Sequence, residues 1–266
     1  MEHEIDMGDH KPIKQHPRRL PPHQRPHVEK HIESLLSQGQ ITASNSLWSS
    51  LVVLARKRDG SFRMCIDYQK LNAVTSRDAQ PLPRVDDILE SLDGVCYFSC
   101  LDLASGYCQV KVAAKDRVKT AFVTPQGQFE WSVMPFGLTS APGTFQRLMN
   151  MALPGLTWKY CLVYLDDILI WSNGFDEHLN RLRAVFERLR TAGVKLKPNK
   201  CHFLKTRVNF LGHVISRKGI ETDSAKIAAL RDWPTPTNGK ELRSFLGLAS
   251  NPILAYPAFG PEAEGF

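Results

Sequence analysis

Apolar residues recur every three or four positions in several stretches of the chain, and this spacing predicts amphipathic helices. The longest runs from Phe175 to Ala192, where leucine, valine and phenylalanine side chains fall on one helical face. Gly39 ends a second helix, predicted from His27 onward. The remaining predicted helices cover residues 83–92, 140–153, 224–232 and 240–248.

Shorter runs rich in β-branched and aromatic residues predict strands. Two of them flank Asp59-Gly60, a strong hairpin signal, and two others meet at Asp166-Asp167. The predicted strands cover residues 51–56, 62–68, 97–103, 120–124, 128–133, 160–165, 168–171, 194–196 and 208–215. Strands and helices alternate irregularly, so the pattern indicates an α+β fold and not a doubly wound one. The sequence has no glycine-rich phosphate loop, which leaves P-loop or Rossmann nucleotide binding unsupported.

The two ends of the sequence differ from its middle. Residues 1–26 are polar and rich in proline, which opposes helix formation, so we expect an extended N-terminal arm. Residues 251–266 hold three prolines and two glycines without periodicity and predict an irregular tail.

Composition narrows the class of protein. Of the 266 residues 42% are hydrophobic and 23% charged, which excludes wholesale disorder. No apolar run is long enough to span a membrane, and the polar N-terminus does not have the pattern of a secretory signal. The six scattered cysteines lack metal-binding spacing, so we expect reduced thiols in an intracellular protein of the cytoplasm or nucleus. The net charge of +7 suits a polyanionic partner without requiring one.

Two adjacent carboxylates, Asp166 and Asp167, interrupt an otherwise apolar run from Tyr160 to Trp171. Ionised carboxylates next to buried strands are costly unless they are paired or bound to a metal ion. An exposed hairpin turn is an equally good explanation of this pair alone, because aspartate is common in turns.

A third carboxylate, Asp102, interrupts the strand predicted at 97–103. If that strand lies beside the Asp166-Asp167 hairpin, three hard oxygen donors converge, and such donors suit Mg²⁺. Two ions held in this way could support phosphoryl transfer. Taken alone, Asp102 would more simply be a capping or salt-bridged residue.

Sequence blocks around these carboxylates resemble a known family. Besides Leu101-Asp102-Leu103-Ala104-Ser105-Gly106-Tyr107 and Tyr164-Leu165-Asp166-Asp167, the blocks are Trp48–Val53, Asp59–Arg63, Asp67–Asn72, Met134–Leu138, Ala141-Pro142 and Phe210–His213. Their order, from about Ile5 to Ala249, is similar to that of the reverse transcriptase domain in gypsy-type long-terminal-repeat (LTR) retrotransposon polyproteins. The resemblance implies a right-hand polymerase fold in which residues 27–220 form the fingers and a palm of mixed sheet and helices. It also implies that residues 221–250 form the start of the thumb or connection helices, and that the thumb or connection is largely missing.

The resemblance also implies an activity, RNA-directed DNA polymerisation that adds dNTPs to a primer 3′-OH on an RNA or DNA template. Two Mg²⁺ ions, or Mn²⁺ in their place, would be held by the catalytic carboxylates Asp102, Asp166 and Asp167. Nucleotide contacts would come from six residues: Lys57, Arg58, Arg63, Tyr107, Phe136 and Gly137. Of these, Tyr107 would exclude a ribose 2′-OH. Primer contact would come from three more: Leu211, Gly212 and His213.

Alternatives remain open at this point. The match is lost from Asn251 onward, so a non-enzymatic retroelement relic that at most binds nucleic acid is the competing hypothesis. A metal-dependent small-molecule hydrolase is a third, weaker one. We expect no ribonuclease H activity, because the catalytic set of that domain has no room in this sequence. Oligomeric state cannot be inferred from the sequence.

Overall fold

The chain is described here from a computed structural model, which covers residues 1–56, 60, 62–76, 78–81, 83, 84, 87, 88, 91, 92, 94–222 and 224–249. Its α-helices are α1 (Arg25–Ser37), α2 (Gln69–Val74), α4 (Ala141–Ala152), α5 (Phe175–Thr191), α6 (Ser224–Arg231) and α7 (Gly239–Ala249). Four 3₁₀ helices join them: η1 (Pro22–Gln24), η2 (Gly106–Gln109), η3 (Arg117–Thr120) and η4 (Pro198–Lys200). No helix in this described part is both long and apolar enough to cross a membrane.

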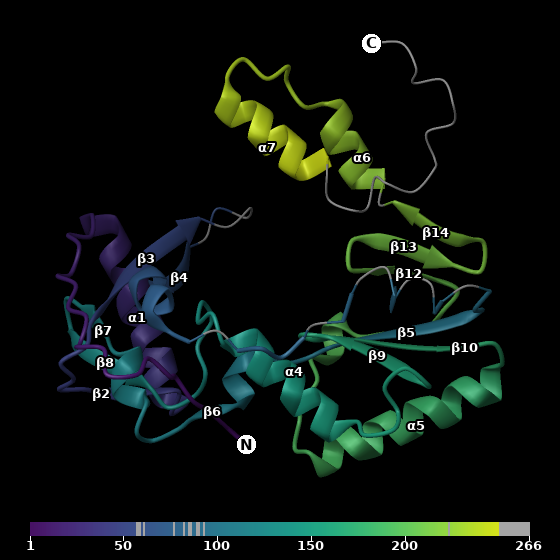
Figure 1. The fold of residues 1–266 in the computed structure, drawn as a ribbon, viewed down its shortest axis with the longest axis horizontal. Coiled ribbons are helices and arrows are strands. Elements are labelled where there is room, and N and C mark those ends of the chain that lie inside the picture. Colours follow the sequence, from purple (N-terminus) through teal and green to yellow (C-terminus); the bar gives the residue numbers. More distant parts are fainter. Residues whose placement is uncertain are drawn as a thin grey trace.

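Two of the sheets dominate the fold, and Figure 1 shows them at opposite sides of α4. The five-stranded sheet has the order β2 (Ile41–Ala43), β8 (Gly127–Trp131), β7 (Phe122–Thr124), β3 (Ser50–Arg56), β4 (Phe62–Asp67). The four-stranded sheet has the order β11 (His202–Lys205), β5 (Tyr97–Asp102), β10 (Asp167–Ser172), β9 (Cys161–Tyr164). These sheets form the fingers and the palm of an α+β fold.

The fingers confirm the predicted pairings. β3 and β4 are antiparallel, with Leu51 opposite Asp67 at one end and Arg56 opposite Phe62 at the other. β7 and β8, which correspond to the strands predicted at 120–124 and 128–133, also pair as an antiparallel hairpin. Helix α1 packs against this sheet through buried residues at four-residue and three-residue spacing, Val28, Ile32 and Leu35.

The palm sheet carries α4 and α5 on one face (Figure 1). Each helix turns a stripe of apolar residues toward the sheet, because its hydrophobic positions recur at helical spacing. Phe145 and Met149 of α4 are fully buried, as is Val185 of α5. Burying one such side chain stabilises the fold by about 1.5–3 kcal/mol.

Two predicted strands need correction. Residues 194–196 do not form a strand and make only one isolated bridge, between Leu103 and Leu196. The run 208–215 is not one strand, since it divides into β12 (Arg207–Phe210) and β13 (His213–Ser216). The turn between them uses left-handed backbone at Leu211 and Gly212, and Gly212 is the residue that marks this break in the sequence. With β14 (Gly219–Thr222), these strands form a separate three-stranded sheet.

The N-terminal segment is tied into the body of the protein. β1 (Glu2–His3) runs parallel to β6 (Lys111–Val112), and His3, Ile5 and Met7 are buried. The prolines do not exclude helix altogether, because η1 begins at Pro22 and the first turn of α1 accepts Pro26. The division of the chain at residues 26, 220 and 250 stays a prediction.

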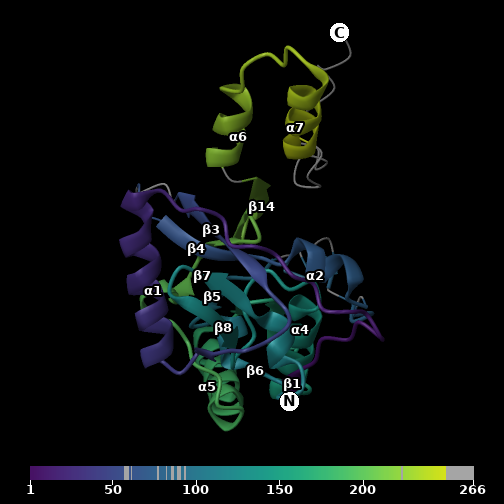
Figure 2. The same cartoon turned by 90° about the vertical axis from the view of Figure 1, so that its left-hand side faces the viewer.

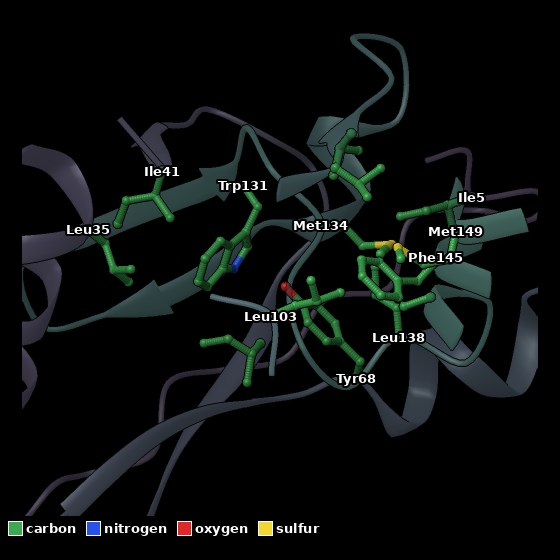
Figure 3. Packing of buried hydrophobic residues seen from close by; sticks show 14 of the residues in the cluster. Ile5, Leu35, Ile41, Tyr68, Leu103, Trp131, Met134, Leu138, Phe145 and Met149 are labelled. Carbon is green, nitrogen blue, oxygen red and sulfur yellow. The ribbon is translucent and has the colours of Figure 1, made fainter. Parts of the chain in front are cut away.

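The main hydrophobic core joins fingers and palm. Figure 3 shows Met134, Leu138, Phe145 and Met149 packed together, with Trp131 and Tyr68 continuing the cluster toward the fingers. A second cluster lies between the palm sheet and β12–β13, and it contains Phe98, Leu162, Trp171, Val208 and Ile215. The two clusters sandwich the palm strands and so fix where their ends lie.

Helices α6 and α7 stand beyond β14, apart from both sheets, in both orientations (Figures 1 and 2). The ring centroids of Trp233 and Phe245 lie 6.4 Å apart and join the two helices. Both helices were predicted, within one residue at each end. Much of the helix predicted at 83–92 and the whole tail at 251–266 lie outside the described residues.

Candidate active site

The three predicted carboxylates meet at one end of the palm sheet. β5 and β10 pair antiparallel in a register that sets Asp102 directly opposite Asp167. Asp166 occupies the turn between β9 and β10, and its carbonyl accepts a hydrogen bond from the Leu103 N–H at 3.3 Å. Residues 64 positions apart in the sequence are thereby brought to one strand edge.

Gln146 of α4, which the sequence analysis did not single out, holds the turn that carries Asp166. Leu165 has a left-handed backbone, with φ of 53°, and its N–H donates to Oε1 of Gln146 at 3.3 Å. Nε2 of the same carboxamide donates to the carbonyl of Val163 at 3.4 Å. Gln146 is 1% exposed. The available signal was a glutamine three residues from Met149, on the apolar side of the predicted helix.

The charges of the site are only partly balanced. Nζ of Lys200 lies 3.1 Å from Oδ2 of Asp102 and forms its ion pair. Oδ1 of Asp166 is buried and has no hydrogen-bond partner. Burial, together with the charges of Asp167 and Asp102, raises the pKa of Asp166 to about 6, and Lys200 partly opposes this. The pKa of Asp167 is also raised, first by burial and then by Asp102.

This imbalance fits a cation. Mutual repulsion and an orphaned carboxylate oxygen are both relieved when a divalent ion binds, and hard oxygen donors are what Mg²⁺ prefers. In the described part of the chain, no three acidic, histidine or cysteine side chains already form a finished metal cage. Asp102, Asp166 and Asp167 therefore converge as donors without being fully arranged around an ion.

A glycine leaves room for the Asp166 carboxylate. A Cβ on Gly106 would collide with Oδ1 of Asp166 and lie 2.9 Å from Cζ of Phe145. Gly106 begins η2, directly after Asp102 and the short connection at 103–105. A side chain at this position would displace the carboxylate or the helix behind it.

Tyr107 follows Gly106 and belongs to an aromatic group beside the carboxylates. Its ring centroid lies 5.1 Å from that of Phe136 and 5.4 Å from that of Phe145. Burial, followed by the charge of Asp166, raises the pKa of Tyr107 to about 12, so its hydroxyl stays protonated at neutral pH. Two predicted nucleotide-binding residues, Tyr107 and Phe136, thus lie in contact with each other.

The other predicted contacts belong to other elements of the fold. Arg63 is exposed on β4 of the fingers, opposite Ala55. Leu211 and Gly212 form the β12–β13 turn, and the side chain of His213 is buried. The predicted contacts Lys57 and Arg58 fall outside the described residues.

Comparison with known proteins identifies the family of the chain. Residues 55–215 match the family described as reverse transcriptase (RNA-dependent DNA polymerase). That match covers more than half of the sequence, so the chain belongs to the reverse transcriptase family.

Its relatives are retrotransposon polyproteins, which confirms the retrotransposon resemblance of the motifs. The chain is 46% identical over 226 residues to the Pol polyprotein from transposon 297 of Drosophila melanogaster, covering 83% of this chain and 21% of that protein. It is 35% identical over 236 residues to the transposon Tf2-3 polyprotein of Schizosaccharomyces pombe, covering 89% of this chain and 18% of that one. The chain thus spans about a fifth of these relatives' length.

Solved structures give the same fold. A foamy viral protease-reverse transcriptase in complex with double-stranded DNA superposes with a TM-score of 0.86 at 27% identity, over 94% of this chain and 44% of that one. The foamy viral enzyme in complex with an RNA/DNA hybrid gives 0.83 at 28% identity, over 94% and 34%. The right-hand polymerase palm and fingers are therefore confirmed.

Proposed function

We propose that this chain is the polymerase part of a gypsy-type retrotransposon reverse transcriptase, which adds dNTPs to the 3′-OH of a primer on an RNA template. The observation that carries this proposal is the convergence of Asp102, Asp166 and Asp167 at one edge of the palm sheet. Membership of the reverse transcriptase family supports the same reaction.

Asp102 and Asp166 are the main proposed ligands of two Mg²⁺ ions, or Mn²⁺ in their place, with Asp167 beside them. When bound, such ions activate an attacking hydroxyl and stabilise the charge on a leaving phosphate oxygen. The chain's own part is to present carboxylates that repel one another and so favour a cation, as the raised pKa of Asp166 reflects. Without a bound ion, the ammonium group of Lys200 balances the charge of the Asp102 carboxylate.

The nucleotide is proposed to lie between the carboxylates and the fingers. Arg63, with Lys57 or Arg58, would contact the triphosphate, since a guanidinium fork matches phosphate oxygens. Tyr107 and Phe136 would form an aromatic wall at the sugar, where a ring excludes a 2′-OH by steric rejection.

The primer and template are proposed to cross the palm. Leu211, Gly212 and His213 would contact the primer near its end. The basic stretch that would follow the duplex comprises Lys195, Lys197, Lys200, Lys205, Arg207, Arg217 and Lys218. The solved foamy viral relatives were captured with double-stranded DNA and with an RNA/DNA hybrid, which supports a duplex ligand. An intracellular setting follows from this substrate.

The test is dNTP incorporation on poly(rA)·oligo(dT) with Mg²⁺, comparing the wild type with Asp166→Asn. We expect incorporation by the wild type and its loss in the variant, because an amide is a much weaker ligand than a carboxylate. Retained binding of the hybrid by the variant shows that the loss is not one of folding.

The relic hypothesis is a distinct outcome of the same experiment. Hybrid binding by the wild type without any incorporation would contradict the proposed activity and support a protein that only binds nucleic acid. No feature of the residues covered by the structure favours that alternative.

A further inference from the structure

Asn72 of α2 spans two backbone groups in the turn that carries Phe136. Its Nδ2 donates to the carbonyl of Gly137 at 2.7 Å, and its Oδ1 accepts from the N–H of Thr139 at 2.9 Å. Both ends of one carboxamide are therefore used on the same turn. Gly137 has a φ of +96°, so this short connection depends on a backbone conformation that few side chains tolerate.

The other side of the turn is tied to the segment that carries Tyr107. The Met134 N–H donates to the Val110 carbonyl at 2.8 Å, and the Val110 N–H donates to the Tyr107 carbonyl at 3.1 Å. Asn72 thus fixes the turn from the fingers side, while the backbone of η2 fixes it from the palm side.

Phe136 depends on these tethers for its position. Its side chain is 51% exposed, whereas Met134 and Leu138 on either side are buried. Its ring packs against that of Tyr107, with the two ring centroids 5.1 Å apart. Since no surrounding core holds Phe136, the backbone of the turn decides where its ring lies against Tyr107.

We propose that Asn72 is a positioning residue for sugar selection, which holds Phe136 against Tyr107 and so keeps the tyrosine ring where a ribose 2′-OH would lie. This inference rests on the proposed function. Steric rejection depends on a rigid wall, because a ring that can tilt away makes room for one extra hydroxyl. Loss of the Asn72 bonds would let the turn relax and would weaken selection without removing any group that touches the nucleotide.

The test is the ratio of kcat/KM for dTTP to that for UTP on poly(rA)·oligo(dT), in wild type and Asn72→Ala. Loss of both bonds is expected to lower this ratio by about tenfold. The ratio is unaffected by the fraction of folded enzyme, because that fraction scales both rates. Asn72→Asp keeps the acceptor for Thr139 but sets a carboxylate against the Gly137 carbonyl, so its ratio should fall as well.

Thr75→Ala is the matched control. Thr75 directly follows α2, and its hydroxyl donates to the Leu71 carbonyl of that helix at 2.8 Å rather than to the turn, so the ratio for Thr75→Ala should equal that of the wild type. In a Phe136→Ala background, Asn72→Ala should change the ratio little further, as expected for residues acting through one contact. An unchanged ratio in Asn72→Ala, or additive effects in the double variant, would overturn the proposal.

A second readout separates this inference from the proposed activity. A dideoxy-terminated primer cannot be extended, so nucleotide binding can be measured without turnover. The readout is the concentration of dTTP or of UTP that stabilises the enzyme–hybrid complex. A preference for dTTP that Asn72→Ala reduces would support the inference even if no incorporation were seen. Absence of any preference in the wild type would contradict it.

Discussion

At the scale of single residues, the site depends on a few close contacts that only one residue type allows. Gly106 is the sharpest case, because its backbone lies against Oδ1 of Asp166 and the ring of Phe145. The Asp166 carboxylate is already disfavoured by burial and by like charge. A further atom in this space would move the carboxylate away from Asp102 and Asp167.

Gly106→Ala is therefore expected to reduce dNTP incorporation by at least about tenfold, since displacement of a reacting group by around 1 Å is costly. Hybrid binding should stay near that of the wild type. Gly247→Ala in α7 is the control, because a Cβ there meets no atom within 4 Å, and its activity should be unchanged. Full activity in Gly106→Ala would show that the close approach has no role in catalysis.

At the scale of elements, periodicity predicted most helices and strands and, with the motifs, the three carboxylates. It could not predict what long-range pairing decides. β11 depends on its pairing with β5, and the β12–β13 turn divides a stretch whose β-rich composition predicted a single strand. Gln146 and Asn72 were missed for the same reason, because their partners lie 19 and 65 or more positions away. An asparagine or glutamine gives no local sign of which distant backbone it binds.

The short strand β1 is also fixed by contacts with residues far away in the sequence. Nδ1 of His3 is hydrogen-bonded to Oγ1 of Thr144 at 2.9 Å, and the His3 carbonyl accepts from Ala113 N–H at 2.9 Å. Burial lowers the pKa of His3 to about 4, although the charges of Asp116 and Asp78 oppose this. His3 therefore contacts α4 through its imidazole and the segment after β6 through its backbone carbonyl. Burial favours the neutral form of this imidazole.

This predicts a loss of stability in acid. Because the folded pKa lies below the unfolded value of about 6.5, the contribution is complete above pH 6.5 and falls as the pH decreases toward 4. Between pH 7.5 and 5, the free energy of unfolding, measured with urea, should fall by about 2 kcal/mol more in the wild type than in His3→Asn. His178, whose pKa is also lowered by burial, affects both proteins equally. Equal losses would contradict this role of His3.

At the scale of the whole molecule, the positive net charge suits the proposed nucleic-acid duplex. The chain carries 34 lysines and arginines against 27 aspartates and glutamates. Helices α4 and α5 cover one face of the palm sheet, and β12–β14 lie on the other side (Figure 1). A duplex bound through phosphates would release counterions, so its affinity depends on salt.

We expect log Kd for an RNA/DNA hybrid to rise linearly with log salt concentration. Lys205→Ala on β11 should reduce the slope by about one unit, the amount expected for one lost phosphate contact. Arg188→Ala on α5 removes the same charge from a helix outside the proposed basic stretch and should leave the slope unchanged. Equal slopes for all three proteins would place the duplex elsewhere.

The proposed nucleotidyl transfer depends on the three converging carboxylates. The most direct test is single-nucleotide incorporation into a primer on an RNA template, in wild type and Asp102→Asn, with hybrid affinity measured on the same preparations. We expect incorporation to fall by at least about a thousandfold while hybrid affinity changes little, since the variant removes one charged ligand and keeps its shape. Incorporation by Asp102→Asn at the rate of the wild type would contradict it.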